Sequence, residues 1–208
     1  MAVIALVGNK GGAGKTTLAL NLATTLAGDR PTVVLDADPQ GSALQWQRIA
    51  GSDSDLEVLD AATGLGDVFA RMASGYDHVV IDCPPSVHAP QTHAALAVSD
   101  IALIPVQPSP LDLWATVHIE EAVEKAREGN PDLRALLVIN QLESRTRLSR
   151  LIRQALAELE LDAAETAIRR RAVYRASVLE GRSVLNMGRG GAAAAAEIRN
   201  LINEVVAQ

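Results

Sequence analysis

The chain has 208 residues, of which 48% are hydrophobic and 21% charged, so it suits one globular domain rather than a disordered or fibrous protein. Aromatic residues make up only 2%, which argues against stacking of single-stranded nucleic acid on aromatic platforms. The single cysteine, Cys83, excludes a disulfide, a four-cysteine zinc site and a cysteine-ligated cluster within one chain. The formal net charge is −6, yet residues 143–175 carry eight arginines against five acidic residues, which favours local binding of a polyanion.

No run of apolar residues is long enough for a membrane-spanning helix, and the N-terminus lacks the features of a signal peptide. The sequence also shows no internal repeat and no linker rich in proline, glycine or serine. We therefore expect a cytoplasmic protein with no membrane partner and a single domain over residues 1–208.

Short β-branched apolar segments alternate with longer segments of helical periodicity. The predicted strands are Ala2–Gly8, Thr32–Asp36, Leu56–Leu59, His78–Asp82, Ile101–Val106 and Arg134–Asn140. The predicted helices are Lys15–Ala27, Ser42–Ala50, Leu65–Ser74, Gln91–Val98, Leu111–Glu128 and Arg147–Leu159. Further on, we expect a short strand within Asp162–Ile168, a helix near Ala172–Leu179 and a terminal helix near Gly191–Val206.

Several of these strands are apolar on both faces, as is typical of parallel strands that helices cover on each side. The alternation predicts the α/β class, with a doubly wound, mostly parallel sheet flanked by helices. The proline-rich segment Pro105–Pro110 is expected to form a stiff, extended loop at the carboxyl end of a strand, where ligands bind in open α/β sheets.

The strongest motif is the segment Gly8–Thr17, GNKGGAGKTT, which follows the first predicted strand and opens the first predicted helix. Its glycines let backbone N–H groups wrap a phosphate chain without Cβ clashes. Lys15 can reach the β- and γ-phosphates and Thr16 can ligate Mg²⁺, as in a P-loop. Asn9 stands where the general pattern has its first glycine, so the match is imperfect at one position.

Two acidic motifs follow predicted strands. The second strand ends in DADPQ, with Asp36 and Asp38, and the fourth ends in VVIDCPP, with Asp82. An aspartate after a strand is by itself usually a cap or turn residue. Together with a P-loop, carboxylates at neighbouring strand ends can hold the water shell of Mg²⁺ and orient an attacking water.

The segments KGGAGKTT, DADPQ and VVIDCPP together resemble the deviant Walker-A family of ParA and MinD ATPases, which are P-loop NTPases. The resemblance spans nearly the whole chain and is greatest to small, single-domain ParA-type partition ATPases, also in the segment IPVQPSPLD. Cys83 departs from the threonine often found in that family's Walker-B strand. The resemblance implies ATP or ADP and Mg²⁺ as cofactors.

The resemblance also implies roles for individual residues. Lys10 looks like the signature lysine that crosses an ATP-sandwiched homodimer to the partner's phosphates, much as an arginine finger does. With Lys15 it is expected to be catalytic, together with Asp38, which would position the lytic water. Asp36, Asp82 and Thr16 would form the magnesium environment. The nucleotide-binding residues would be Lys10, Gly11, Gly12, Ala13, Gly14, Lys15, Thr16, Thr17 and, at the adenine, Asn140.

In the resembling family, ATP-bound dimers coat nucleoid DNA without sequence preference, so we expect a nucleoid-associated protein whose arginines contact phosphates. A ParB-like activator bound to the cargo would stimulate hydrolysis. Solvated arginine faces are also common, which leaves each single arginine open. The candidate DNA contacts are Arg145, Arg147, Arg150, Arg169, Arg170, Arg171 and Arg175.

The expected function is an ATPase that segregates or positions a cargo, a plasmid or chromosome locus in the first place. The alternative is the same engine carrying a protein cargo, such as a carboxysome or chemoreceptor cluster. A MinD-like membrane-surface regulator is disfavoured because Ala196–Gln208 is not basic. An iron–sulfur reductase needs cluster cysteines that this sequence lacks, and ligase relatives lack a lysine like Lys10. The presence of Lys10, Lys15 and Asp38 argues against a module that binds nucleotide without turnover. The four histidines show no metal-ligand pattern.

Overall fold

In the part of the chain that the structure describes, seven parallel strands form one sheet in the order β3-β2-β4-β1-β5-β6-β7. The computed structural model describes residues 1–54, 56–143 and 161–206. Across the sheet, each strand runs parallel to its neighbours, as the apolar strands predict. The strands are β1 (Ala2–Leu6), β2 (Thr32–Asp36), β3 (Glu57–Asp60), β4 (His78–Asp82), β5 (Ile101–Val106), β6 (Arg134–Ile139) and β7 (Asp162–Ala163).

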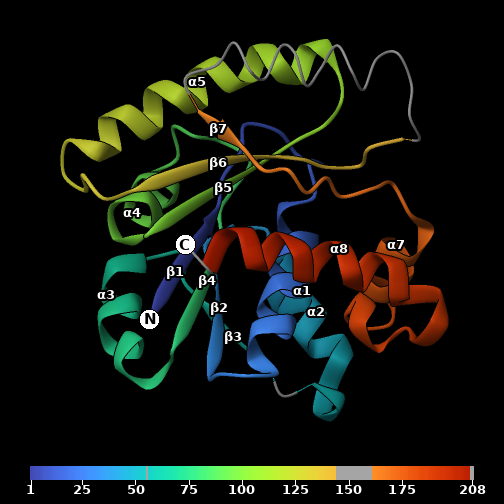
Figure 1. The fold of residues 1–208 in the computed structure, drawn as a ribbon. Coiled ribbons are helices and arrows are strands. Elements are labelled where there is room, and N and C mark those ends of the chain that lie inside the picture. The colour runs from blue at the N-terminus through green and yellow to red at the C-terminus, as the bar shows by residue number, and fades with distance from the viewer. Residues whose placement is uncertain (55, 144–160, 207–208) are drawn as a thin grey trace.

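Helices cover both faces of the sheet (Figure 1). On one face, α1 (Lys15–Ala27), α2 (Ser42–Ala50), α7 (Ala172–Leu179) and α8 (Gly188–Val206) share a core with alternate strand residues such as Ile4 and Leu6. On the other face, α3 (Leu65–Met72), α4 (Pro90–Val98) and α5 (Pro110–Arg127) pack with Val3, Ala5 and Val7. Short 3-10 turns occupy Gly51–Asp53, Ala73–Gly75 and Val184–Asn186.

The chain winds in both directions from β1, because β4 lies on one side of it and β5 on the other. In open α/β sheets this reversal leaves a crevice at the carboxyl ends of the central strands, where ligands bind. The segment Gly8–Thr17 begins at that end of β1, and Asp36 and Asp82 are register partners at the ends of β2 and β4. The fold therefore gathers the predicted motifs at one edge of the sheet.

The predicted fold class is confirmed, and most predicted boundaries coincide with the observed ones or differ from them by one or two residues. The proline-rich segment is a partial exception, because Pro105 and Val106 still pair with β6 and α5 begins at Pro110. The Val7 amide donates to the Leu103 carbonyl, just past the end of β1. Pro105 lies two residues further on, so the side of β5 on which its N–H is missing faces no residue of β1. The sheet therefore tolerates this proline.

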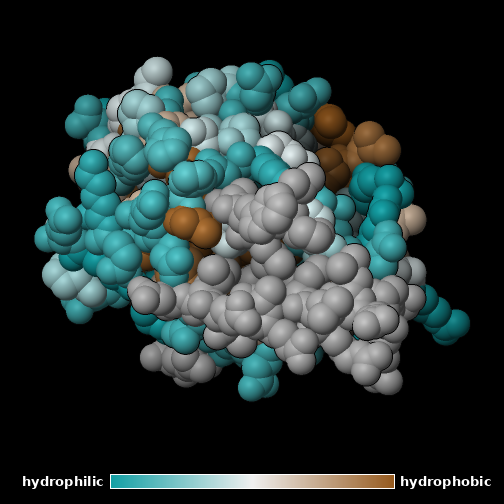
Figure 2. Space-filling view, turned by 90° about the horizontal axis from the view of Figure 1, so that it is seen from above, coloured by the Kyte–Doolittle hydropathy of each residue, from teal (hydrophilic) through white to brown (hydrophobic). Residues whose placement is uncertain are grey.

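The predicted strand within Asp162–Ile168 is shorter than expected, with two paired residues and a separate bridge between Leu142 and Arg169. The predicted helix Arg147–Leu159 lies outside the described residues. Within the described ranges, no helix combines the length and the apolar character that crossing a membrane requires. The face that carries α5 is mostly hydrophilic where it is described (Figure 2).

Candidate nucleotide site

The loop between β1 and α1 is shaped for an anion. Gly14 adopts φ 91° and Gly12 adopts φ 79°, both in the region that favours glycine. No side chain caps α1, so the first N–H groups of this helix are left for a ligand, and the positive end of the helix dipole favours a negative one. A Cβ atom on Gly14 would lie 2.4 Å from Asn140 Nδ2, so a larger residue there would have to displace the Asn140 amide.

Three side-chain amides from the ends of β5 and β6 hold the carbonyl groups of this loop. Asn140 Nδ2 donates to the Ala13 carbonyl at 2.6 Å. Gln141 Nε2 and Gln107 Nε2 both donate to the Gly12 carbonyl at 2.8 Å. These bonds tie the loop to the ends of β5 and β6 and restrain its backbone at Gly12 and Ala13.

Gln141 has φ 56°, a left-handed conformation that costs a non-glycine residue about 1 kcal/mol or more. Its backbone N–H donates to Asn140 Oδ1 at 2.9 Å, and its bond to Gly12 holds its side chain. Sequence reasoning missed Gln141 and Gln107, whose only signal was their position just after predicted strands. Asn140 was expected to contact adenine, and this role stays a prediction beside its observed bond to the loop.

Lys15 lies at the base of the loop, and only 6% of it is exposed. Its Nζ donates to the Lys10 carbonyl at 3.1 Å, which folds the loop around the ammonium group. Burial lowers the pKa of Lys15, and the neighbouring Asp82, Cys83 and Asp38 oppose this shift. An anionic ligand would stabilise this buried ammonium group by pairing its charge, as the P-loop interpretation requires.

Asp82 ends β4 in a fully buried position, and neither of its carboxylate oxygens has a hydrogen-bond partner of good geometry. Burial raises the pKa of Asp82 to about 7, and the carboxylates of Asp36 and Asp38 add to the rise. The Thr16 hydroxyl and the Lys15 ammonium lower this pKa in part. A buried carboxylate with unsatisfied oxygens is costly, and a cation with its bound water would satisfy it.

Asp36, which was predicted beside Asp82 in the magnesium environment, differs from Asp82 because its carboxylate oxygens have hydrogen-bond partners. Its Oδ2 accepts from the backbone N–H groups of Ala43 at 2.9 Å and Leu44 at 3.0 Å, and its Oδ1 accepts from Asp38 N at 3.3 Å. Burial raises its pKa, against these three bonds. Asp36 thus fixes the start of α2 and the turn that carries Asp38, and a role at the metal stays a prediction.

The donors present at the site suit Mg²⁺ better than a softer or more fully enclosed metal. Thr16 and Asp82 offer oxygen, the ligand that Mg²⁺ prefers, and Mg²⁺ takes many of its ligands from water and phosphate. Across the described part of the chain, no group of three or more His, Cys, Asp and Glu residues could hold a metal on its own. Cys83 is buried, and burial raises the pKa of its thiol, so it is an inert small side chain.

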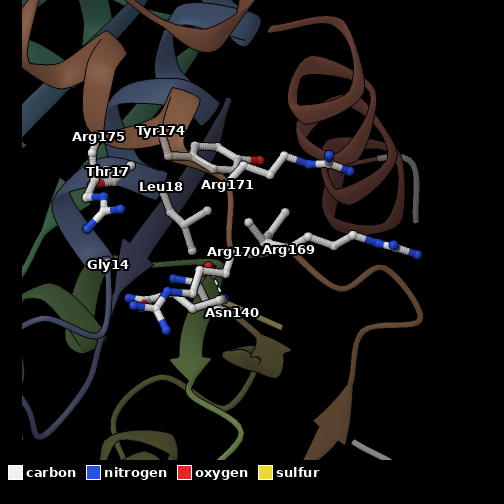
Figure 3. A pocket seen from close by; sticks show the side chains of 11 residues that line it. Gly14, Thr17, Leu18, Asn140, Arg169, Arg170, Arg171, Tyr174 and Arg175 are labelled. Carbon is white, nitrogen blue, oxygen red and sulfur yellow. Dashed lines mark hydrogen bonds between the residues drawn. The ribbon is translucent and has the colours of Figure 1, made fainter. Parts of the chain in front are cut away.

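A pocket adjoins the loop and the first turn of α1 (Figure 3). One wall consists of Gly14, Thr17 and Leu18, and Asn140 with Gln141 forms its floor. The opposite wall is the segment that leads into α7 together with the start of that helix, and it contains four of the predicted DNA contacts. These are Arg169, Arg170, Arg171 and Arg175.

Three of these arginines have acidic partners in the structure. Arg171 pairs with Glu197 of α8 at 2.6 Å, and Arg170 pairs with Glu143 at 2.5 Å. Arg169 reaches Glu197 at 3.9 Å. Contact of this group with DNA stays a prediction. The other predicted DNA contacts, Arg145, Arg147 and Arg150, lie outside the described residues.

The comparisons with known proteins agree with this geometry. Residues 4–184 match the family described as CbiA, the CobQ/CobB/MinD/ParA nucleotide binding domain. The maintenance of carboxysome distribution protein A of Halothiobacillus neapolitanus is 39% identical over 98% of this chain and 95% of its own length. The chromosome-partitioning ATPase Soj of Thermus thermophilus is 34% identical over 72% of this chain and 73% of its own length.

Among solved structures, an ATP complex of a McdA variant from Cyanothece shares the fold, with a TM-score of 0.76 at 17% identity, over 99% of this chain and 96% of that one. The match to the family covers the P-loop, both acidic strand ends and the strand before Asn140. The resemblance to the ParA and MinD ATPases is thereby confirmed. The chain belongs to the CobQ/CobB/MinD/ParA family of nucleotide-binding domains and is a ParA-type ATPase.

Proposed function

We propose that the protein hydrolyses ATP in the presence of Mg²⁺ and uses the cycle to position a cargo. The observation that supports this most directly is the buried, unpartnered carboxylate of Asp82 beside Thr16 at the mouth of the P-loop. Thr16 and Asp82 would hold Mg²⁺ directly or through its water, and the ion, when bound, offsets charge on the phosphates.

The chain's own residues account for the rest of the chemistry. The backbone N–H groups of the loop and the Lys15 ammonium bind the phosphates. Asp38 accepts a hydrogen bond from the attacking water and directs it at the γ-phosphorus. The bond from that phosphorus to the β–γ bridging oxygen then breaks, and ADP and phosphate leave. The Asp38 Oδ1 already accepts from Gln40 N at 2.9 Å, which fixes the carboxylate for this task.

Lys10 supplies the link between hydrolysis and assembly. Its carbonyl is held by Lys15 on the inner side of the loop. In the proposed ATP-bound homodimer, its ammonium group reaches the phosphates of the partner and stabilises the charge that grows there. ATP therefore joins two copies, and hydrolysis separates them.

The proposed cargo is a carboxysome rather than a DNA locus. A relative named for carboxysome distribution aligns with 98% of this chain and 95% of its own length, whereas the chromosome-partitioning relative aligns over about three quarters of either. Segregation of a plasmid or chromosome locus is the second candidate, which that chromosome-partitioning relative favours. In either case, nucleoid DNA serves as the track, and a cargo-bound activator, ParB-like in role, stimulates hydrolysis.

The cargo is tested by deleting the gene in its native host and imaging a fluorescent carboxysome shell protein. We expect the carboxysomes to lose their regular spacing and to gather into clusters, and an intact copy of the gene to restore the spacing. The Lys15→Ala variant serves as the matched control and should fail to restore it. Unchanged spacing, together with more frequent loss of a plasmid or chromosome region, would assign the DNA cargo instead.

A further inference from the structure

We propose that Arg170 and Arg175 bind the nucleoside part of ATP, and that Glu197 is a positioning residue that holds them in place. This proposal rests on the proposed function because it takes ATP as the ligand. It assigns two of the predicted DNA contacts to the nucleotide and identifies a glutamate that sequence reasoning did not single out.

The first argument is the position of the pocket. P-loop N–H groups bind the phosphates, and a nucleoside joined to them needs a cavity next to the loop. The pocket begins there, at Gly14, Thr17 and Leu18, and the buried side chains of Ile168 and Tyr174 line its far side. Its apolar lining suits the faces of a purine, and the arginines bring donors to its edge.

The second argument is the direction of the arginine side chains. In Figure 3 the guanidinium groups of Arg170 and Arg175 turn towards Gly14, Thr17 and Asn140. Those of Arg169 and Arg171 turn the opposite way, and both of these arginines pair with Glu197. The cluster is therefore divided into two inward and two outward cations. A guanidinium group at this place can stack on a purine and donate to ribose hydroxyls.

The third argument is the set of bonds that Glu197 makes from α8. Only 14% of its side chain is exposed. Its Oε1 accepts from Arg171 at 3.2 Å from Nε and 2.6 Å from Nη2, and its Oε2 accepts from the Arg169 backbone N–H at 3.2 Å and the Tyr174 hydroxyl at 3.4 Å. One carboxylate thus holds the Arg169 backbone and the Arg171 side chain, on either side of Arg170, and the Tyr174 side chain in α7, which carries Arg175.

The ion pair of Arg170 with Glu143 does not oppose this role. Both side chains are more than half exposed, and exposed pairs contribute about 1 kcal/mol or less, so ATP can displace the pair at small cost. The pair of Arg171 with Glu197 is more shielded, and its hydrogen bonds are more numerous. Arg171 therefore keeps its pair with Glu197 when ATP binds, whereas Arg170 is available to the ligand.

The test compares two ligands of the full chain by calorimetry, ATP and inorganic tripolyphosphate, which has the phosphates without the nucleoside. Arg170→Ala and Arg175→Ala should each weaken ATP binding about tenfold and leave tripolyphosphate within about twofold. Arg199→Ala, which removes an exposed cation of α8 remote from the pocket, is the charge control and should change neither affinity.

Glu197 is tested against a second glutamate of the same helix. Glu204 accepts from the backbone N–H groups of Glu165 and Thr166 at 2.9 Å, so it ties the same segment to α8 away from the pocket. Glu197→Ala should weaken ATP binding about tenfold at unchanged tripolyphosphate affinity, whereas Glu204→Ala should lower the melting temperature without changing the ratio of the two affinities. Glu197→Gln, which keeps the acceptor atom, should recover part of the loss and replaces Glu197→Ala if that variant does not fold.

The outcomes separate the two proposals. Arginine variants that bind ATP like the parent, or that lose ATP and tripolyphosphate equally, would overturn the nucleoside role. An equal effect of Glu197→Ala and Glu204→Ala on the affinity ratio would make Glu197 merely structural. A parent protein that binds neither ligand would contradict the proposed function itself, and the nucleoside role would fall with it.

Discussion

At the scale of single residues, the buried carboxylate of Asp82 is a source of electrostatic cost at the site. Its carboxylate is fully buried, and its folded-state pKa of about 7 exceeds the ordinary value of 3.8. Between these two pH values, the folded state binds more protons than the unfolded state, so the contribution of Asp82 to stability falls as pH rises through this window. Binding of a cation would reverse that loss.

Asp82→Asn should therefore stabilise the nucleotide-free protein more at pH 8 than at pH 5. The gain at pH 8 should reach at most about 4 kcal/mol, from about three pH units at 1.36 kcal/mol each. Urea unfolding of both proteins at the two pH values measures it. A difference that does not depend on pH would mean that Asp82 does not titrate in this range.

Asp38 acts at the same scale on turnover. Because Asp38→Ala removes the acceptor for the attacking water and leaves the loop and Lys15 in place, ATP should still bind while hydrolysis falls at least a hundredfold. Single-turnover assays with radiolabelled ATP measure both quantities. Hydrolysis at the parental rate would reassign the orientation of water to another group.

At the scale of elements, α2 and α7 meet through a backbone contact. Gly181, just after α7, has φ 63°, and a Cβ atom on it would lie 2.4 Å from the Ala50 nitrogen at the end of α2. Backbone atoms cannot move aside as the tip of a side chain can. This glycine therefore sets the distance between two helices on the P-loop side of the sheet.

Gly181→Ala should lower the free energy of unfolding by about 2–4 kcal/mol, from the strained φ and the clash together. Gly190→Ala in α8 is the matched control, since that glycine has open space and an ordinary φ. The control should be neutral or stabilising by up to about 1 kcal/mol. Equal destabilisation by both variants would refute the packing argument.

At the scale of the whole molecule, the proposed dimer doubles every surface charge. Affinity for duplex DNA should therefore depend on ATP and fall steeply with salt, with a log–log slope of about −0.9 per phosphate neutralised. Replacing Arg145, Arg147 and Arg150 by alanine should flatten this slope without changing ATP hydrolysis in the absence of DNA. Fluorescence anisotropy with duplexes of unrelated sequence measures it. Equal binding with ADP and ATP would contradict the switch.

The Lys10→Ala variant separates the effect on dimerisation from the effect on nucleotide binding. Because Lys10 offers its carbonyl to Lys15 through the backbone, the substitution should leave monomeric ATP binding within about twofold. Analytical ultracentrifugation with ATP should then show only monomers, and the DNA affinity should equal that with ADP. A dimer that persists with ATP would place Lys10 outside the interface.

The sequence by itself determined the sheet, the P-loop and the acidic strand ends. Apolar β-branched segments with covered faces specify buried parallel strands through local periodicity, and GNKGGAGKTT after such a strand has few other uses. Asp36 and Asp82 could be placed together because parallel strands end at one edge of the sheet. These features depend only on residues that are neighbours in the chain, or on the fact that parallel strands end at the same edge of a sheet.

Only the tertiary structure decided which partners these residues have. The amides of Gln107 and Gln141 reach the Gly12 carbonyl from strands β5 and β6, and Glu197 reaches Arg171 from a helix that follows much later. Such contacts join residues 26 to 129 positions apart, and no local pattern encodes them. Asp36 likewise accepts from the backbone amides of Ala43 and Leu44 at the start of α2, seven and eight positions further on, and its predicted role at the metal stays a prediction. The arginine run looked uniform in sequence, and the structure divides it in space because the carboxylate of Glu197 pairs with Arg169 and Arg171, whereas Arg170 and Arg175 turn the opposite way.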